Sequence, residues 1–129
     1  MASSSSHVIT QSITLNLPTI NQHVRLDNNN YLMWLSVVRP ILRSNDLEGI
    51  VDGSEPCPQQ FLIDAEGKKT LNPTFTLWTK KDQLMLSWMN VSLSKSVLST
   101  MYGLNSSKDV WSTLANRFAS QPHLHVAHL

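Results

Sequence analysis

The fold is decided by one long stretch, Pro73-Thr-Phe-Thr-Leu-Trp-Thr-Lys-Lys-Asp-Gln-Leu-Met-Leu-Ser-Trp-Met-Asn-Val-Ser-Leu93. Asn72 precedes it as a predicted N-cap, and Pro73 suits the first helical position, where its missing N–H would have no intrahelical partner. The apolar residues form two neighbouring stripes at helical spacing, Phe75, Trp78, Met85 and Met89 in one and Leu77, Leu84, Trp88 and Val91 in the other. The remaining positions, Asp82 among them, are polar and predict a solvent-facing edge. We therefore predict a central helix that contacts other elements on more than one side.

A second amphipathic helix is predicted before this stretch. Its apolar residues recur at helical spacing: Tyr31, Trp34, Leu35, Val38, Ile41 and Leu42. Asp27-Asn-Asn-Asn30 offers several N-caps. Pro40 lies inside the helix, where it removes a hydrogen bond and predicts either a kink or a restart. Residues 47–51 predict a short helical turn that ends at Asp52-Gly53.

Two more helices are predicted after the central one. The first is short, is capped by Ser92 or Ser94 and ends at Gly103, and its apolar residues are Val97, Leu98 and Met101. Ser106-Ser-Lys-Asp109 then resembles a capping box, with Asp in place of the preferred Glu. Pro122 is expected to end the helix that follows, which places these apolar residues on one face: Val110, Trp111, Leu114 and Phe118.

The rest of the chain predicts loops and extended pieces. Residues 53–73 carry three prolines and two glycines and predict a loop, in which Phe61-Leu-Ile63 is expected to tuck back as an apolar anchor. Residues 13–17 and 24–26 are short extended pieces that should lie against the helices. We predict an all-α fold, a small bundle of four to five helices with an extended or disordered N-terminal arm. The predicted boundaries are a disordered arm (1–12), a helical domain (13–121) and a tail (122–129).

Composition and charge argue against several classes of function. Ten basic and nine acidic side chains give a net charge of +1, which is not the clustered positive charge that binds a phosphate backbone. Cys57 is the single cysteine and has no predicted base beside it. No apolar run is long enough to span a membrane. We expect no enzyme activity, no cofactor, no metal and no small-molecule substrate, and we expect a cytoplasmic location.

Several short motifs, in the same order, resemble the N-terminal region of the copia-type LTR-retrotransposon Gag polyproteins of plants. The motifs are Asn30-Tyr-Leu-x-Trp34, Leu47-Glu-Gly-Ile-Val-Asp-Gly53, Asn72-Pro-x-Phe-x-Leu-Trp78, Asp82-Gln-Leu-x-Leu-Ser-Trp88, Ser92-Leu-Ser, Val110-Trp111 and Arg117-Phe-Ala-Ser120. The resemblance covers roughly residues 13–121. It implies a helical protein that self-associates into particles and packages RNA. It also implies a structural role for six aromatic residues: Tyr31, Trp34, Trp78, Trp88, Trp111 and Phe118.

The chain also departs from this pattern. It reaches Leu129 without the Cys-x2-Cys-x4-His-x4-Cys zinc knuckle and without protease, integrase or reverse-transcriptase regions. We therefore expect a truncated element product or a host gene made from one, and we do not expect this chain alone to package RNA.

The leading hypothesis is a non-enzymatic, Gag-like capsid N-terminal module that associates with itself or with related Gag proteins. The alternatives are a domesticated adaptor or interfering fragment that binds a protein partner, direct nucleic-acid binding, and an inert relic. The residues expected to form the core or an association surface are Tyr31, Trp34, Leu35, Val38, Trp78, Leu84, Met85, Trp88, Trp111, Leu114 and Phe118.

Overall fold

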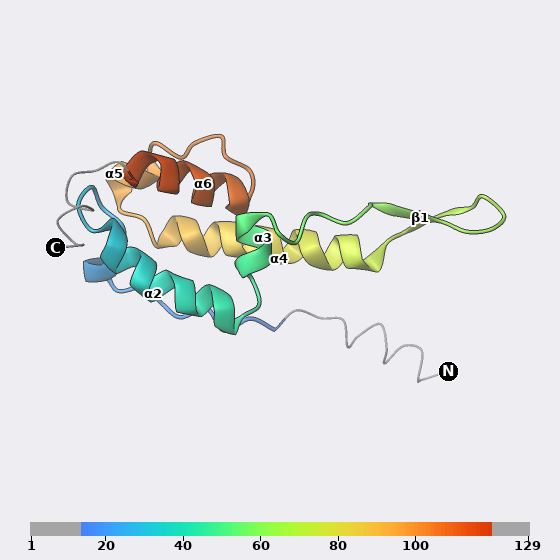
Figure 1. The fold of residues 1–129 in the computed structure, drawn as a ribbon, viewed down its shortest axis with the longest axis horizontal. Helices are drawn as coiled ribbons and strands as arrows, with labels where there is room; N and C mark the ends of the chain where they lie inside the picture. Colours follow the sequence, from blue (N-terminus) through green and yellow to red (C-terminus); the bar gives the residue numbers. More distant parts are fainter. Residues whose placement is uncertain (1–13, 120–129) are drawn as a thin grey trace.

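The computed structural model describes residues 14–119 of the chain (Figure 1). The predictions for the arm and for the tail therefore lie outside the described residues. The elements in chain order are η1 (Gln22–Val24), α2 (Tyr31–Ser44), α3 (Glu48–Asp52), β1 (Phe61–Ile63), β2 (Lys69–Leu71), α4 (Pro73–Val91), α5 (Lys95–Leu98) and α6 (Ser107–Phe118).

The long helix α4 is the centre of the fold, as its sequence predicts. It runs between α2 and α6, and the short helix α3 contacts α2, α4 and α6 (Figure 1). The segment that joins α3 to α4 extends away from the helices as a two-stranded hairpin (Figure 1). Among residues 14–119, no helix is long and apolar enough to cross a membrane.

The predicted caps of α4, α5 and α6 are confirmed, whereas Asn30 before α2 makes no side-chain cap hydrogen bond and accepts from the Asp27 N–H instead. The Asn72 side chain accepts a hydrogen bond from the Thr74 N–H at 3.0 Å, with Pro73 as the first helical residue. The Ser94 hydroxyl caps α5, and the Ser106 hydroxyl accepts from the Asp109 N–H at 3.1 Å to cap α6. Gly53 ends α3 with φ +89°, a left-handed conformation that glycine adopts without a steric penalty.

The helix α2 continues through Pro40 to Ser44, so of the two outcomes expected at Pro40 the restart does not occur. Two helix ends differ from expectation. The helix α5 ends at Leu98, so Gly103 lies beyond its end. The helix α6 ends at Phe118, before Pro122 is reached. A proline or a C-terminal glycine sets only the outer limit of a helix, and these two helices end before that limit.

The prediction of a purely all-α fold is wrong at residues 61–71. β1 and β2 pair antiparallel, with Phe61 opposite Leu71, Leu62 opposite Thr70 and Ile63 opposite Lys69. The Asp64 carboxylate accepts hydrogen bonds from the N–H groups of Glu66 and Lys68 at 2.9 and 2.8 Å, and this closes the turn. The expected apolar anchor is also wrong, because every residue of both strands is exposed.

The short extended pieces lie against the helices, as predicted. Leu26 is fully buried. Its N–H donates to the Ser92 carbonyl and its carbonyl accepts from the Ser94 N–H, both at 2.8 Å. This makes a single parallel bridge between residue 26 and residue 93 and not a sheet. Ile20 is also buried, and Leu15 and Leu17 pack on the edge of the core.

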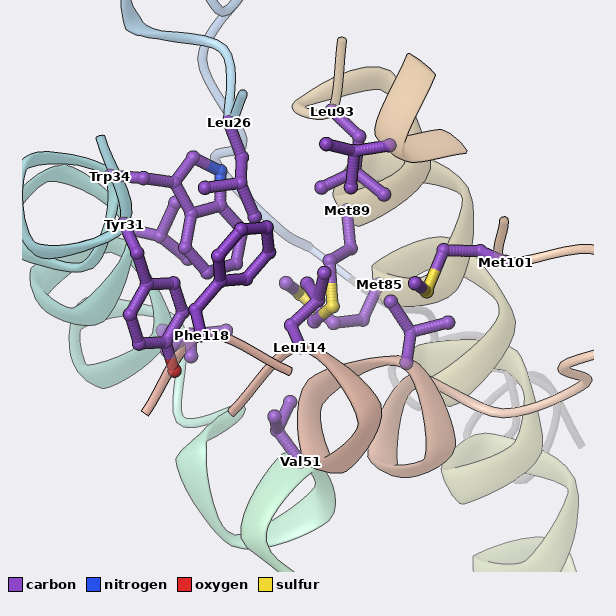
Figure 2. Packing of buried hydrophobic residues seen from close by; sticks show 14 of the residues in the cluster. Leu26, Tyr31, Trp34, Val51, Met85, Met89, Leu93, Met101, Leu114 and Phe118 are labelled. Atoms are coloured by element: carbon purple, nitrogen blue, oxygen red, sulfur yellow. The ribbon is translucent and has the colours of Figure 1, made fainter. Parts of the chain in front are cut away.

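The core is built around a cluster of aromatic rings (Figure 2). Tyr31 stacks on Trp34 and on Phe118, with ring centroids 6.1 and 5.4 Å apart. Met85 and Met89 of α4 and Leu114 of α6 fill the space beside them (Figure 2). Sequence segments from α2, α4 and α6 thus meet in one apolar interior, which is the main stabilising feature of the fold.

Burial of Tyr31 makes stability sensitive to alkaline pH. Burial raises the pKa of the Tyr31 hydroxyl above its ordinary value of 10.0, and the nearby Arg39 opposes this shift only in part. Below pH 10 the tyrosine is neutral in both the folded and the unfolded chain. As the pH rises through this value, the unfolded chain loses the proton first, so stability falls. We expect urea unfolding between pH 8 and 11 to show that the free energy of unfolding falls more steeply with rising pH for the wild type than for Tyr31→Phe. Equal slopes would contradict this.

Candidate association surface

The structure separates the eleven predicted core or association residues into three groups. Six are buried: Tyr31, Trp34, Val38, Met85, Leu114 and Phe118. Four are half-buried at the edge of the core: Leu35, Trp78, Trp88 and Trp111. Leu84 is 47% exposed and lies outside the core. Of the two apolar stripes of α4, the one with Met85 and Met89 is covered and the one with Leu84 is open.

The open stripe contains Leu84, Trp88 and Val91. These residues lie four and three positions apart, so their side chains share one face of α4. Leu84 is 47% and Val91 53% exposed. With the neighbouring extended segment they line an open groove, here called the α4 groove, which is formed by Leu17, Pro18, Thr19, Ile20, Arg25, Leu84, Ser87, Trp88 and Val91.

Hydrogen bonds to α4 and to the residue after α2 hold the extended segment in place. The Trp88 indole N–H donates to the Pro18 carbonyl at 2.8 Å. Two residues earlier in the chain, the Asn45 side chain accepts from the Asn16 N–H at 2.7 Å and donates to the Asn16 carbonyl at 3.2 Å. One wall of the groove is therefore fixed to α2 and the other is α4 itself. Both walls of the groove are therefore held in place by the fold.

The α4 groove carries little charge. Arg25 supplies the one charged side chain among its lining residues, and the rest are apolar or carry a hydroxyl group. Two such surfaces can face each other with little like-charge repulsion. By contrast, the groove along α2 contains Arg39 and Arg43 beside Leu32 and Leu35, so two copies of that face would oppose like charges.

The titratable side chains of residues 14–119 do not gather into a metal site. No group of three or more His, Cys, Asp or Glu side chains in this range is placed to hold a metal ion. Cys57 is exposed, and its thiol donates a hydrogen bond to the neighbouring Pro58 carbonyl at 3.5 Å. Glu48 forms an exposed ion pair with Arg43 at 3.2 Å. Hydrogen bonds from Ser54 lower the pKa of Asp52, as expected for a carboxylate in a solvated turn.

Two buried polar residues join the helices, and sequence reasoning missed both. The Asp82 carboxylate accepts hydrogen bonds from the Ser107 N–H at 2.9 Å and from the Ser107 hydroxyl at 2.7 Å. Ser92 accepts from the Trp34 indole N–H at 3.1 Å and donates to the Met89 carbonyl at 2.6 Å. Asp82 lies on the polar side of α4 and resembles a solvent-facing residue in the sequence. A single sequence carries no signal that α6 begins beside it.

Two plant proteins are similar to this chain. They are retrovirus-related Pol polyproteins from the transposons RE2 and RE1 of Arabidopsis thaliana, 29% identical over 95% of this chain and 26% identical over its full length. The chain spans only 8% and 9% of the length of these two polyproteins. No family model matches the chain, and no solved structure matches it. These similarities support a plant retrotransposon origin.

Proposed function

We propose that this chain is a non-enzymatic structural module of the Gag type, a capsid-like domain that acts by association with copies of itself. The observation that carries the proposal is the α4 groove, where α4 leaves the stripe with Leu84 and Val91 open although Met85 and Met89 of the neighbouring stripe are fully buried. The similarity to plant retrotransposon polyproteins supports it, and so do the motifs that resemble copia-type Gag.

The proposed mechanism is a two-fold contact between the α4 grooves of two copies. Such a contact covers Leu84, Val91 and the exposed edge of Trp88 in each copy. Completing the burial of a half-exposed Leu or Val contributes roughly 1 kcal/mol. Association costs roughly 4–15 kcal/mol in lost freedom of motion. A few such side chains only just offset this cost, so a contact through the α4 groove is weak and its population depends on protein concentration.

A charge placed in the groove should weaken this contact. We expect Leu84→Asp to raise the dissociation constant at least about ten-fold, since two new carboxylates would face each other across the two-fold axis. The stability of the monomer should change little, because Leu84 is exposed. Analytical ultracentrifugation measures the first effect and thermal unfolding the second.

The matched control places the same charge on α2. Leu32 is 38% exposed and lies outside the α4 groove. We expect Leu32→Asp to leave the dissociation constant unchanged. If Leu32→Asp weakens association and Leu84→Asp does not, the contact lies on α2 and the assignment to α4 is wrong.

The alternative of a host adaptor or interfering fragment makes a different prediction in the same experiment. Such a protein would be a monomer at every concentration and would bind a separate protein partner through the α4 groove. Direct RNA binding remains disfavoured by the net charge of +1. Tight binding to RNA that weakens steeply with added salt would overturn that view.

A further inference from the structure

The β1–β2 hairpin presents two free edges that differ in chemistry. The hairpin extends beyond the helices, and Phe61, Leu62, Ile63 and Leu71 are 44%, 47%, 66% and 53% exposed (Figure 1). An isolated two-stranded hairpin is at best marginally stable in water, whereas three or more strands support one another. Each free edge also carries backbone groups that another strand can bind.

The pairing register shows which backbone groups are free on β1. The Asn72 N–H donates to the Gln60 carbonyl at 2.8 Å, and the Asp64 N–H donates to the Lys68 carbonyl at 3.0 Å. Backbone groups alternate in direction along an antiparallel strand, so those of Gln60, Leu62 and Asp64 face β2. The N–H and C=O groups of Phe61 and Ile63 therefore point outward from the hairpin.

The two edges differ in charge. β1 is Phe61-Leu-Ile63 and carries no charged residue, whereas β2 begins at Lys69 and follows Lys68. Lysine at a strand edge opposes pairing with another strand, because its charge would be desolvated or would face a second lysine. The Lys69 ammonium group also lies 5.6 Å from the centre of the Phe61 ring. The edge of β2 is thus protected against pairing and the edge of β1 is not.

We propose that β1 is a second self-association site, at which the β1 strands of two copies pair antiparallel about a two-fold axis through Leu62. In this register Phe61 of each copy lies opposite Ile63 of the other and exchanges two backbone hydrogen bonds with it. The result is a four-stranded sheet in the order β2, β1, β1, β2. Aromatic and β-branched side chains directly opposite each other stabilise such a sheet. The partner is a second copy, because the uncharged edge is complementary to itself.

This inference rests on the proposed function and extends it. One two-fold contact per copy closes a dimer and stops there. A copy that carries two different two-fold contacts, one at the α4 groove and one at β1, joins two neighbours and extends into a chain of copies. The hairpin thus supplies the second contact that a module needs to assemble beyond the dimer formed through the α4 groove.

Cysteine cross-linking tests the register directly. In a Cys57→Ser background, Leu62→Cys places two thiols opposite each other, in a pair with Cα atoms about 4.5 Å apart, which a disulfide can bridge. Thr70→Cys makes the matched change at the centre of the β2 edge. Under mild oxidation we expect about ten-fold more disulfide-linked dimer for Leu62→Cys than for Thr70→Cys. Equal yields from the two variants would overturn the proposal.

A proline at the free edge separates this contact from the α4 groove. Ile63→Pro removes an outward N–H without removing a hydrogen bond of the hairpin, and Lys69→Pro does the same on the protected edge. In light scattering, we expect Ile63→Pro to stop growth at the dimer and Lys69→Pro to have no effect. Growth of Ile63→Pro beyond the dimer, like the wild type, would overturn the role of β1 and leave the proposed function standing. A wild-type chain that never associates would overturn both.

Discussion

Replacing Trp34 with alanine is expected to lower the free energy of unfolding by about 3–5 kcal/mol, the usual range for a buried large aromatic side chain. Trp34 is completely buried, and its ring lies 6.1 Å from that of Tyr31 and 5.7 Å from that of Trp111. The substitution leaves a cavity where α2, α4 and α6 meet. It also leaves the Ser92 hydroxyl without the indole donor. Small domains have only about 5–15 kcal/mol of total stability, so this loss would remove a large fraction of it.

Urea unfolding followed by circular dichroism measures this loss. Trp34→Phe gives up the hydrogen bond to Ser92 but keeps an aromatic ring in the cluster. Its loss of unfolding free energy should therefore be clearly smaller than that of Trp34→Ala. Tyr102→Ala serves as the control, because Tyr102 is 96% exposed and its removal should change stability by less than about 0.5 kcal/mol. If Trp34→Ala behaved like Tyr102→Ala, the aromatic cluster would not be the centre of the core.

The second large effect is expected at Asp82. Asp82→Ala should lower the free energy of unfolding by about 2–3 kcal/mol, because it leaves the buried N–H and hydroxyl of Ser107 without an acceptor. Asp82→Asn keeps one acceptor oxygen at this place, so its free energy of unfolding should fall less than that of Asp82→Ala. The same urea experiment measures both variants.

The control for Asp82 is an acidic residue of α6, the helix whose first residue Asp82 binds. Asp109 lies in the first turn of α6 and is exposed. Its replacement by alanine removes a favourable interaction with the helix dipole, which is worth only about 0.3–1 kcal/mol. Losses of equal size at the two positions would mean that Asp82 is no more than a surface charge.

Local features of the fold could be predicted from the sequence. The caps at Asn72, Ser94 and Ser106 depend on residues within three positions of one another, and helical spacing identified the buried residues of α2 and α6. The hairpin was missed for a physical reason. Its strands have three residues each and do not alternate apolar with polar, because no face of the hairpin is buried.

The candidate site lies at the limit of what one sequence can show. Helical spacing placed Leu84 and Met85 in two neighbouring stripes of α4, and both stripes are equally apolar. Which stripe is covered depends on where α6 and the segment before η1 pack, and those contacts are far apart in the sequence. The structure leaves Leu84 exposed and buries Met85. The same long-range packing makes Asp82 a buried partner of α6.

The central claim is that this chain associates with itself, and size-exclusion chromatography with light scattering tests it most directly. The wild-type chain should be measured over about a hundred-fold range of concentration, because mass action shifts a weak association across such a range. We expect the mean molar mass to rise with concentration, from that of the monomer to that of a dimer and larger species. A monomer mass at every concentration would contradict the account.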